Sequence, residues 1–532
     1  MRLAVGPVGP SQWLARGLAI LAGLGAAFAQ PPWGFLPGLL GYGLMFYLAD
    51  WTAEPHRLRS AFFRGWLVGC AYFVVSLWWL AEPFQIDAKN QGWMAPFAVL
   101  LTAMLMAFFW GAAAALFRLL AGAGVARALL FAGALAAFEW LRGHILTGFP
   151  WDLPGESWRA GSAPSQTAAL VGAYGLSWLT LVAACAPWVV REGWLGRVSA
   201  GAAVAIVAGL FLFGAARLAR APTSLPGAPW VRVVQADVKQ ESKYDQRLFA
   251  SIVARYTGLT ARPSARLADI VVWPEGAIPA AFEEYLAPSA WTETAIAGAL
   301  APNQTLILGG YRFGADARGA PATYNSLAVV RHAASGLAVV GLYDKFRLVP
   351  FGEFMPLDGL ASRLGIKQLV HVGDGFAPGP RPRPLRVIGL PIMQPLICYE
   401  SLFSGFTRDG ARSGGMRAAW IVNISNDAWF GTGSGPLQHL NIASYRAIEE
   451  GLPMVRATPT GISAVIDAYG RIVPGEQLGE GAMGVIDAPL PPALSPTLFS
   501  RLGDAPFLLM LIVSLTGARW PPRARRGVGQ TR

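Results

Sequence analysis

A series of long apolar segments occupies most of the first 220 residues, and it constrains the fold more than any other feature. Most of these segments approach the ~20 residues with which an α-helix crosses a ~30 Å hydrocarbon core. Seven lie in this part of the chain and an eighth lies near the C-terminus: Trp13–Ala29, Trp33–Ala49, Ala61–Leu80, Ala95–Leu116, Ala128–Leu141, Thr167–Val190, Ala200–Ala216 and Phe499–Leu515. We therefore predict a multi-pass α-helical membrane protein with about eight spans, of which the fifth is the shortest.

The composition also favours a membrane location. Hydrophobic residues make up 54% of the chain and charged residues 14%, whereas soluble globular proteins carry about 25% charged residues. The net charge of +12 would suit either nucleic acid or a membrane surface. Because the arginines occur in short runs between the apolar segments, we expect the lipid bilayer, and no nucleic acid, as the partner.

The arginine distribution predicts the orientation of the spans. With a cytoplasmic N-terminus, the inner loops and the tail carry the denser set, namely Arg57, Arg59, Arg64, Arg118, Arg127, Arg191, Arg197, Arg519, Arg523, Arg525, Arg526 and Arg532. The outer loops carry Lys89, Arg142, Arg159, Arg217 and Arg220. This topology places the segment after Ala216 outside the cytoplasm. The first apolar segment could instead be a cleaved signal peptide, but the spans that follow it favour a retained helix.

The segment between the seventh and eighth spans has a different pattern. Short β-branched runs alternate with amphipathic helical stretches, which indicates a layered α/β domain. The predicted strands are Val231–Gln235, Asp269–Trp273, Thr305–Gly309, Ser326–Val330, Pro395–Ile397, Ala419–Asn423, Met454–Ala457 and Ala464–Asp467. The predicted helices are Asp245–Thr260, Trp291–Leu300 and Leu437–Glu450.

Prolines mark both ends of this domain: Pro222, Pro226, Pro491, Pro492 and Pro496. From the positions of these prolines and of the apolar segments, we predict four regions. They are an N-terminal transmembrane domain of about seven spans (1–220), the α/β domain (229–491), a C-terminal transmembrane helix (497–518) and a basic cytoplasmic tail (519–532).

Three chemistry-bearing side chains follow apolar runs in the α/β domain. Glu275 comes after a strand that stops at Pro274, and Lys345 and Cys398 each follow a short apolar run. In α/β sheets, ligands collect outside the carboxyl ends of the strands. Taken singly, these side chains could be a turn carboxylate, a surface ammonium and an inert buried thiol. Together they can form one site in which Glu275 takes the proton of the thiol and Lys345 stabilises an oxyanion.

Trp-Pro-Glu, then Lys, then Cys-Tyr-Glu resembles the nitrilase (carbon–nitrogen hydrolase) superfamily, whose Glu-Lys-Cys triad matches Glu275, Lys345 and Cys398. This resemblance covers roughly half the chain and implies an αββα sandwich. Further motifs extend it over nearly the whole chain to the apolipoprotein N-acyltransferase family: Glu139–Arg142, Gly148–Trp151, Leu348–Glu353, Ile397–Ser401 and Asn423–Gly431.

The family resemblance implies a ping-pong acyl transfer without a cofactor. The sn-1 acyl chain of a phospholipid, typically phosphatidylethanolamine, passes to Cys398 as a thioester and then to the N-terminal amine of a diacylglyceryl-apolipoprotein. It also implies a bacterial inner membrane, with the α/β domain in the periplasm. We expect a monomer, since membrane helices would block the surfaces through which soluble nitrilases assemble.

By the same resemblance, Glu353, Tyr399 and Glu400 support the triad. Glu353 would orient Lys345 or shuttle a proton, unless it is only a turn residue. On chemical grounds, we expect the backbone N–H of Tyr399 to supply a second oxyanion donor. The alternative for Tyr399 and Glu400 is that they only hold the nucleophile loop in place.

Substrate-binding positions are less sharply defined. Tyr244 stands where relatives often carry Trp, and its flat apolar face suits lipid. Trp429 and Phe430 either line an acyl pocket or belong to the core, and the core is favoured. Pro459 replaces the usual Asn of the family, which removes an amide side chain and a backbone donor.

The other patterns carry no recognisable site. The five histidines show no metal-ligand spacing, and His439 has no acidic or histidine partner at i+4. Gly309-Gly310 is interpreted as a turn. Two alternatives to the acyltransferase remain: a membrane-anchored nitrilase-type amidase that hydrolyses an amide, and a non-catalytic scaffold. A single anchor would suffice for the first, and the intact triad argues against the second.

Overall fold

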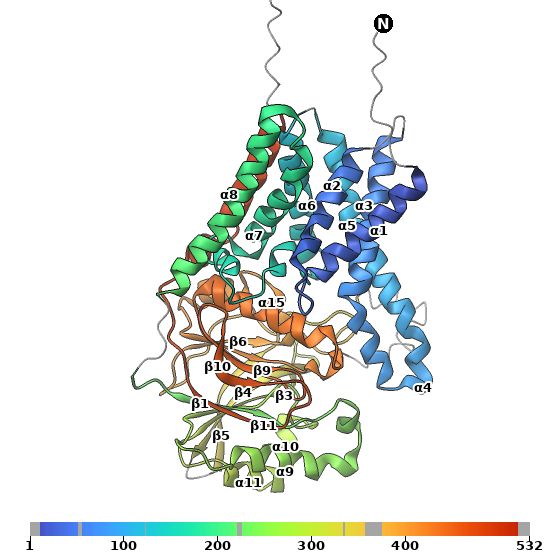
Figure 1. Cartoon of the computed structure of the whole chain (residues 1–532). Helices are drawn as coiled ribbons and strands as arrows, with labels where there is room; N and C mark the ends of the chain where they lie inside the picture. Colours follow the sequence, from blue (N-terminus) through green and yellow to red (C-terminus); the bar gives the residue numbers. More distant parts are fainter. Residues whose placement is uncertain are drawn as a thin grey trace, which may run out of the picture.

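The structure is a computed structural model, and it describes residues 11–51, 56–122, 124–220, 226–333, 336–356 and 375–519. A helical half and an α/β half pack on each other (Figure 1). The helical half contains α1 (Gln12–Phe28), α2 (Leu40–Asp50), α3 (Arg57–Ser76), α4 (Ala88–Gln91), α5 (Ala95–Leu120), α6 (Ala126–His144), α7 (Ala168–Cys185), α8 (Gly193–Leu218), α16 (Leu498–Leu502) and α17 (Ala505–Arg519). The predicted basic tail beyond Arg519 lies outside the described residues.

A helix occupies each of the eight predicted span positions, although not at the predicted length. Within the described part of the chain, four helical segments are long and apolar enough to cross a membrane: Arg57–Ser76, Ala88–Leu120, Pro164–Val189 and Gly193–Leu218. α2 has only 11 residues because a 3-10 turn with Pro37 precedes it. Region 497–518 is divided into α16 and α17 at Gly503, whose φ is +63°. The eight-span topology therefore stays a prediction.

Small residues allow α3 and α5 to approach closely. A Cβ atom at Gly65 would lie 2.7 Å from the Cβ of Ala114, and one at Gly69 would lie 2.9 Å from the Cβ of Ala107. Small residues at such crossings are typical of helix pairs in membranes, where tight van der Waals packing drives association.

Large apolar side chains point outward from α5, α8 and α17. The exposed set includes Leu101, Leu105, Phe108, Val204, Leu212, Leu509 and Ile512. An apolar surface of this extent would be a liability in water. These helices therefore require an apolar environment, which a bilayer supplies.

The α/β half contains two sheets. The first has the order β11-β1-β2-β3-β4-β5 and the second the order β10-β9-β8-β7-β6. Their bounds are β1 Trp230–Gln235, β2 Ile270–Val272, β3 Thr305–Ala315, β4 Pro321–Ala333, β5 Gly336–Asp344, β6 Met393–Ile397, β7 Trp420–Ile424, β8 Met454–Ala457, β9 Ser463–Ile466, β10 Ile472–Leu478 and β11 Gly484–Pro489.

The sheets face each other across a shared apolar core that includes Val233, Ile307, Met393 and Val422. The outer face of the first sheet packs against α9 (Phe249–Thr260) and α11 (Trp291–Ala299), with Tyr256 and Ile296 in that contact. α15 (Ser434–Glu450) covers the second sheet (Figure 1). The result is the αββα sandwich that the family resemblance implied.

All eight predicted strands are present, but β5, β10 and β11 were missed. These three strands are edges of the two sheets, where a strand needs less apolar character because only one side is paired. Gly309-Gly310 is not a turn, since both residues lie inside β3. The interpretation as a turn was wrong. The close approach of Glu275 to β3 explains the glycine at position 309.

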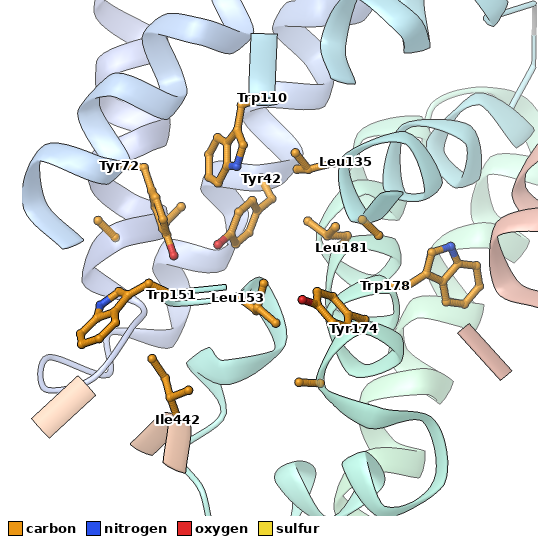
Figure 2. Packing of buried hydrophobic residues seen from close by; sticks show 14 of the residues in the cluster. Tyr42, Tyr72, Trp110, Leu135, Trp151, Leu153, Tyr174, Trp178, Leu181 and Ile442 are labelled. Atoms are coloured by element: carbon orange, nitrogen blue, oxygen red, sulfur yellow. The ribbon is translucent and has the colours of Figure 1, made fainter. Parts of the chain in front are cut away.

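α15 joins the two halves of the molecule. Almost all of its residues are buried, although many are polar. Asn441 accepts a hydrogen bond from the Ala160 N–H (2.8 Å) and donates to the Glu156 carbonyl (2.9 Å), and the Tyr445 hydroxyl donates to the Gly155 carbonyl (3.0 Å). Figure 2 shows the apolar part of this contact, with Ile442 of α15 near the buried aromatic side chains of the helical half.

Candidate active site

The predicted triad residues come together at one edge of the sandwich. Glu275 follows β2, Lys345 follows β5 and Cys398 follows β6. The Nζ of Lys345 lies 3.3 Å from Oε1 of Glu275. All three residues are buried, and the charges of Glu275 and Lys345 both act on the Cys398 thiol.

The backbone presents Cys398 at a sharp turn. The residue has a φ of +48° and begins a 3-10 turn, Cys398–Leu402, directly after β6. A left-handed φ is costly for a residue with a side chain and persists only where the surroundings enforce it. The Ser401 hydroxyl contributes to this by donating to the Cys398 carbonyl oxygen (2.8 Å).

The thiol is protonated in the resting site. Burial raises the pKa of Cys398 to about 12, the Glu275 charge acts in the same direction, and Lys345 opposes both. A thiol in this state is a weak nucleophile until a neighbouring base removes its proton. The thiol therefore requires a base during the reaction, and Glu275 is the carboxylate that acts on it most strongly.

Neighbouring groups fix the Glu275 carboxylate in place. Its Oε1 accepts from the Asn325 side-chain amide (2.7 Å), and its Oε2 accepts from the Asn426 N–H (2.8 Å). A Cβ atom at Gly309 would lie 2.6 Å from the Cα of Glu275. The glycine in β3 thus makes room for the base.

Lys345 is held between two carboxylates. Besides Glu275, its Nζ donates to Oε1 of Glu353 (2.9 Å), and Oε2 of Glu353 accepts from the Val349 N–H (2.8 Å). Burial opposes the charge of Lys345, but Glu275 and Glu353 together outweigh it and raise the pKa of Lys345. This arrangement fits the orienting role predicted for Glu353, whereas its proton shuttle stays a prediction.

Glu400 ties the nucleophile turn to the segment that carries Lys345. Its carboxylate accepts from the Ile397 N–H (2.9 Å), the Phe346 N–H (2.8 Å) and the Tyr343 hydroxyl (2.8 Å). Removing this acceptor would leave buried donors without partners, which costs about 1–3 kcal/mol each.

Tyr399 connects the nucleophile turn to the helical half. Its hydroxyl donates to the Gly148 carbonyl oxygen. The Arg142 guanidinium holds the loop of Gly148 by donating to the carbonyls of Phe149 (2.5 Å) and Trp151 (3.1 Å), and it pairs with Glu139. The motifs Glu139–Arg142 and Gly148–Trp151 of the helical half therefore together support the position of the nucleophile turn.

Sequence reasoning missed a second buried cluster beneath this turn. The Nδ1 of His439 lies 3.0 Å from Oδ1 of Asp427, and its Nε2 lies 3.0 Å from the Ser401 hydroxyl. Arg456 donates to Oδ2 of Asp427 (2.7 Å). Burial and the charge of Arg456 lower the pKa of His439. Spacing along α15 could not reveal this cluster, because its partners come from other elements.

Among the described residues, no group of three histidine, cysteine or acidic side chains could hold a metal ion.

The sequence offered one signal for the buried polar contacts of the site. This signal was the presence of polar residues inside otherwise buried elements, such as Arg456 in β8 and Asn325 in β4.

The remaining predicted positions lie around the site. Phe430 packs against Trp79 (ring centroids 4.6 Å apart) and belongs to the aromatic contact between the halves, which agrees with the core alternative. Tyr244 is 67% exposed, Trp429 is half-buried and Pro459 is buried. Their contacts with a substrate stay predictions.

A buried Glu–Lys–Cys site on an αββα sandwich defines a carbon–nitrogen hydrolase. The family model of carbon-nitrogen hydrolases matches residues 231–495, and the model of the apolipoprotein N-acyltransferase N-terminal domain matches residues 22–186. Among solved structures, a mutant amidase from Nesterenkonia is 16% identical and covers 53% of this chain and 98% of that chain, with a TM-score of 0.34.

Full-length relatives are more similar. The apolipoprotein N-acyltransferase of Caulobacter vibrioides is 54% identical over 504 residues, and that of Bradyrhizobium diazoefficiens is 38% identical over 519 residues; each match covers 94% of both chains. The chain belongs to the apolipoprotein N-acyltransferase family.

Proposed function

We propose that this enzyme moves an acyl chain from a phospholipid to the N-terminal amine of a diacylglyceryl-apolipoprotein through a thioester on Cys398. Glu275 takes the thiol proton while the sulfur attacks the sn-1 ester carbonyl. Lys345 and the backbone N–H of Tyr399 stabilise the oxyanion. The proton passes from Glu275 to the departing lysophospholipid.

The second half-reaction uses the same groups. The amine of the apolipoprotein attacks the thioester and gives its proton to Glu275 as the amide forms. The tetrahedral intermediate then expels the Cys398 thiolate, which takes that proton back. An amidase would use water here instead.

The main observation behind this proposal is the hydrogen bond from the Tyr399 hydroxyl to the Gly148 carbonyl oxygen. It ties the nucleophile turn to the half of the chain whose outward apolar faces require lipid. Both substrates are lipids, so a site at this junction avoids their transfer into water. The relatives are named apolipoprotein N-acyltransferases, which also favours the acyltransferase over the amidase alternative.

The membrane arrangement is part of the proposal. Eight spans with a cytoplasmic N-terminus would divide the chain into a transmembrane domain (1–220), a periplasmic catalytic domain (229–491), a last helix (497–518) and a cytoplasmic tail (519–532). Supporting this are the helices at all eight positions and the arginine distribution. The enzyme would work as a monomer in the inner membrane, with phosphatidylethanolamine as donor.

Mass spectrometry of the purified enzyme after incubation with phosphatidylethanolamine tests the chemistry. We expect an acyl adduct on Cys398 that hydroxylamine removes and that a diacylglyceryl lipopeptide discharges as N-acylated product. Cys398→Ala and Glu275→Gln should lack the adduct, while Cys70→Ala, altered in α3, should retain it. No adduct on Cys398 would refute the covalent step, and free fatty acid as the only product would favour the hydrolase.

A further inference from the structure

Lys243 places a second ammonium group beside the catalytic base. The residue lies in a 3-10 turn, Glu241–Tyr244, and its stem is half-exposed. Its Nζ is buried and has no hydrogen-bond partner among the described residues. Burial of an unpaired cation is costly, so this position calls for an acceptor from outside the chain.

The turn of Lys243 is attached to the catalytic site. Oε1 of Gln240 accepts from the Asn426 side-chain amide (2.9 Å), and the Asn426 N–H donates to Glu275. A Cβ atom at Gly276, the residue after the base, would lie 3.5 Å from the Nζ of Lys243. The Nζ of Lys243 therefore lies beside Gly276, the residue that follows Glu275 in the chain, and on the same side of the sandwich.

Glu275 is not the missing partner. Lys345, Asn325 and Asn426 already donate to its carboxylate, and no ion pair joins it to Lys243. Burial lowers the pKa of Lys243 to about 8, with Glu275 opposing. The ammonium therefore remains mostly charged at neutral pH.

We propose that Lys243 binds the phosphodiester of the acyl donor while its sn-1 ester lies at Cys398. This inference rests on the proposed function. The phosphate is the anion that every phospholipid donor carries, one glycerol backbone from the reacting ester, and an ammonium is a suitable point-charge partner for it. The diacylglyceryl acceptor has no phosphate, so Lys243 distinguishes the first half-reaction from the second.

The test compares two acyl donors in single-turnover acylation of Cys398. One is phosphatidylethanolamine, and the other is p-nitrophenyl palmitate, which has no phosphate. We expect Lys243→Met to lower the acylation rate from the phospholipid on the order of ten- to hundredfold and to leave the rate from the nitrophenyl ester unchanged. Lys243→Arg should keep most of the phospholipid rate.

Two variants frame this comparison. Lys239→Met, at an exposed lysine of the same segment, should behave as the wild type with both donors. Glu275→Gln should lose both reactions. Normal reaction of Lys243→Met with the nitrophenyl ester also reports that the variant is folded.

Equal losses with both donors would overturn the proposal, because Lys243 would then act through Glu275. An unchanged phospholipid rate would overturn it too. If the wild type acquired an adduct from the nitrophenyl ester but none from the phospholipid, the phospholipid donor itself would be refuted, and this proposal with it.

Discussion

The hydroxyl of Tyr399 donates to the carbonyl oxygen of Gly148, a residue 251 positions earlier in the chain. Gly148 belongs to a loop whose carbonyls are held by Arg142 from the end of α6. The position of the nucleophile turn therefore depends on the helical half as well as on the sandwich.

Tyr399→Phe tests this dependence. The ring keeps its packing against Phe403, but the Gly148 carbonyl loses its donor, which costs about 1 kcal/mol. We expect kcat to fall about fivefold with no change in fold. Tyr256→Phe is the matched control, because the Tyr256 hydroxyl is buried without a hydrogen-bond partner among the described residues. Equal rates for the two variants would show that the contact has no catalytic effect.

Gly309→Ala should displace the catalytic base. The new Cβ would lie 2.6 Å from the Cα of Glu275, so the backbone of the base must shift. We expect a loss of activity on the order of a hundredfold. In the same strand, a Cβ at Gly314 would lie 2.7 Å from the end of the Arg312 side chain, which can move, and 3.2 Å from a ring carbon of Tyr324. Because no backbone of the catalytic site is displaced, Gly314→Ala should stay active. Comparable acylation rates of the two variants would contradict the steric explanation.

Arg142→Met should destabilise the helical half. Arg142 and Glu139 form a fully buried pair, and removal of one partner from such a pair costs about 3–5 kcal/mol. A lower melting temperature in detergent, together with faster proteolysis after residue 142, would be the readout. Arg247→Met breaks an exposed pair with Asp245 and should melt like the wild type. An unaltered melting temperature of Arg142→Met would show that the pair with Glu139 does not stabilise the helical half.

Glu450 gives the protein a specific pH dependence. The residue borders a cavity of about 320 Å³ together with Arg417, and burial raises its pKa from 4.5 to about 7. Between these values the unfolded chain has lost the proton and the folded chain holds it, so this contribution to stability is lost as the pH rises from about 4.5 to 7. The full contribution is about 3 kcal/mol.

Glu450→Gln cannot ionise and lacks this dependence. We therefore expect the melting temperature of the variant, relative to the wild type, to rise with pH through that window and to level off above pH 7. A difference that is constant from pH 4.5 to 8 would mean that Glu450 ionises normally.

The sequence predicted the regular parts of the fold well. Apolar length located the helices, and β-branched runs located the central strands. Of the four edge strands, β6 was predicted and β5, β10 and β11 were missed. β10 and β11 contain proline or glycine and need little apolar surface. The triad was predicted from a family resemblance, since no local pattern around Glu275 or Cys398 reveals that they meet.

The supporting contacts were beyond sequence reasoning. Asn325, Lys243 and the His439 cluster act across elements far apart in the chain, and their residue types are common on surfaces. Their importance depends on burial, which only the packed structure shows. Gly309 illustrates the point, because the same residue signals a turn in isolation and a close approach of Glu275 in the fold.

The polar face of α15 has a consequence for how such enzymes diversify. Its side chains bond to backbone atoms of the segment from Gly155 to Ala173 in the other half. A catalytic domain taken from a soluble hydrolase would lack these matching groups and would bury unpaired ones instead. Exchange of one half by recombination at the linker near Pro226 would therefore destabilise the contact between the halves, unless the matching groups were exchanged with it.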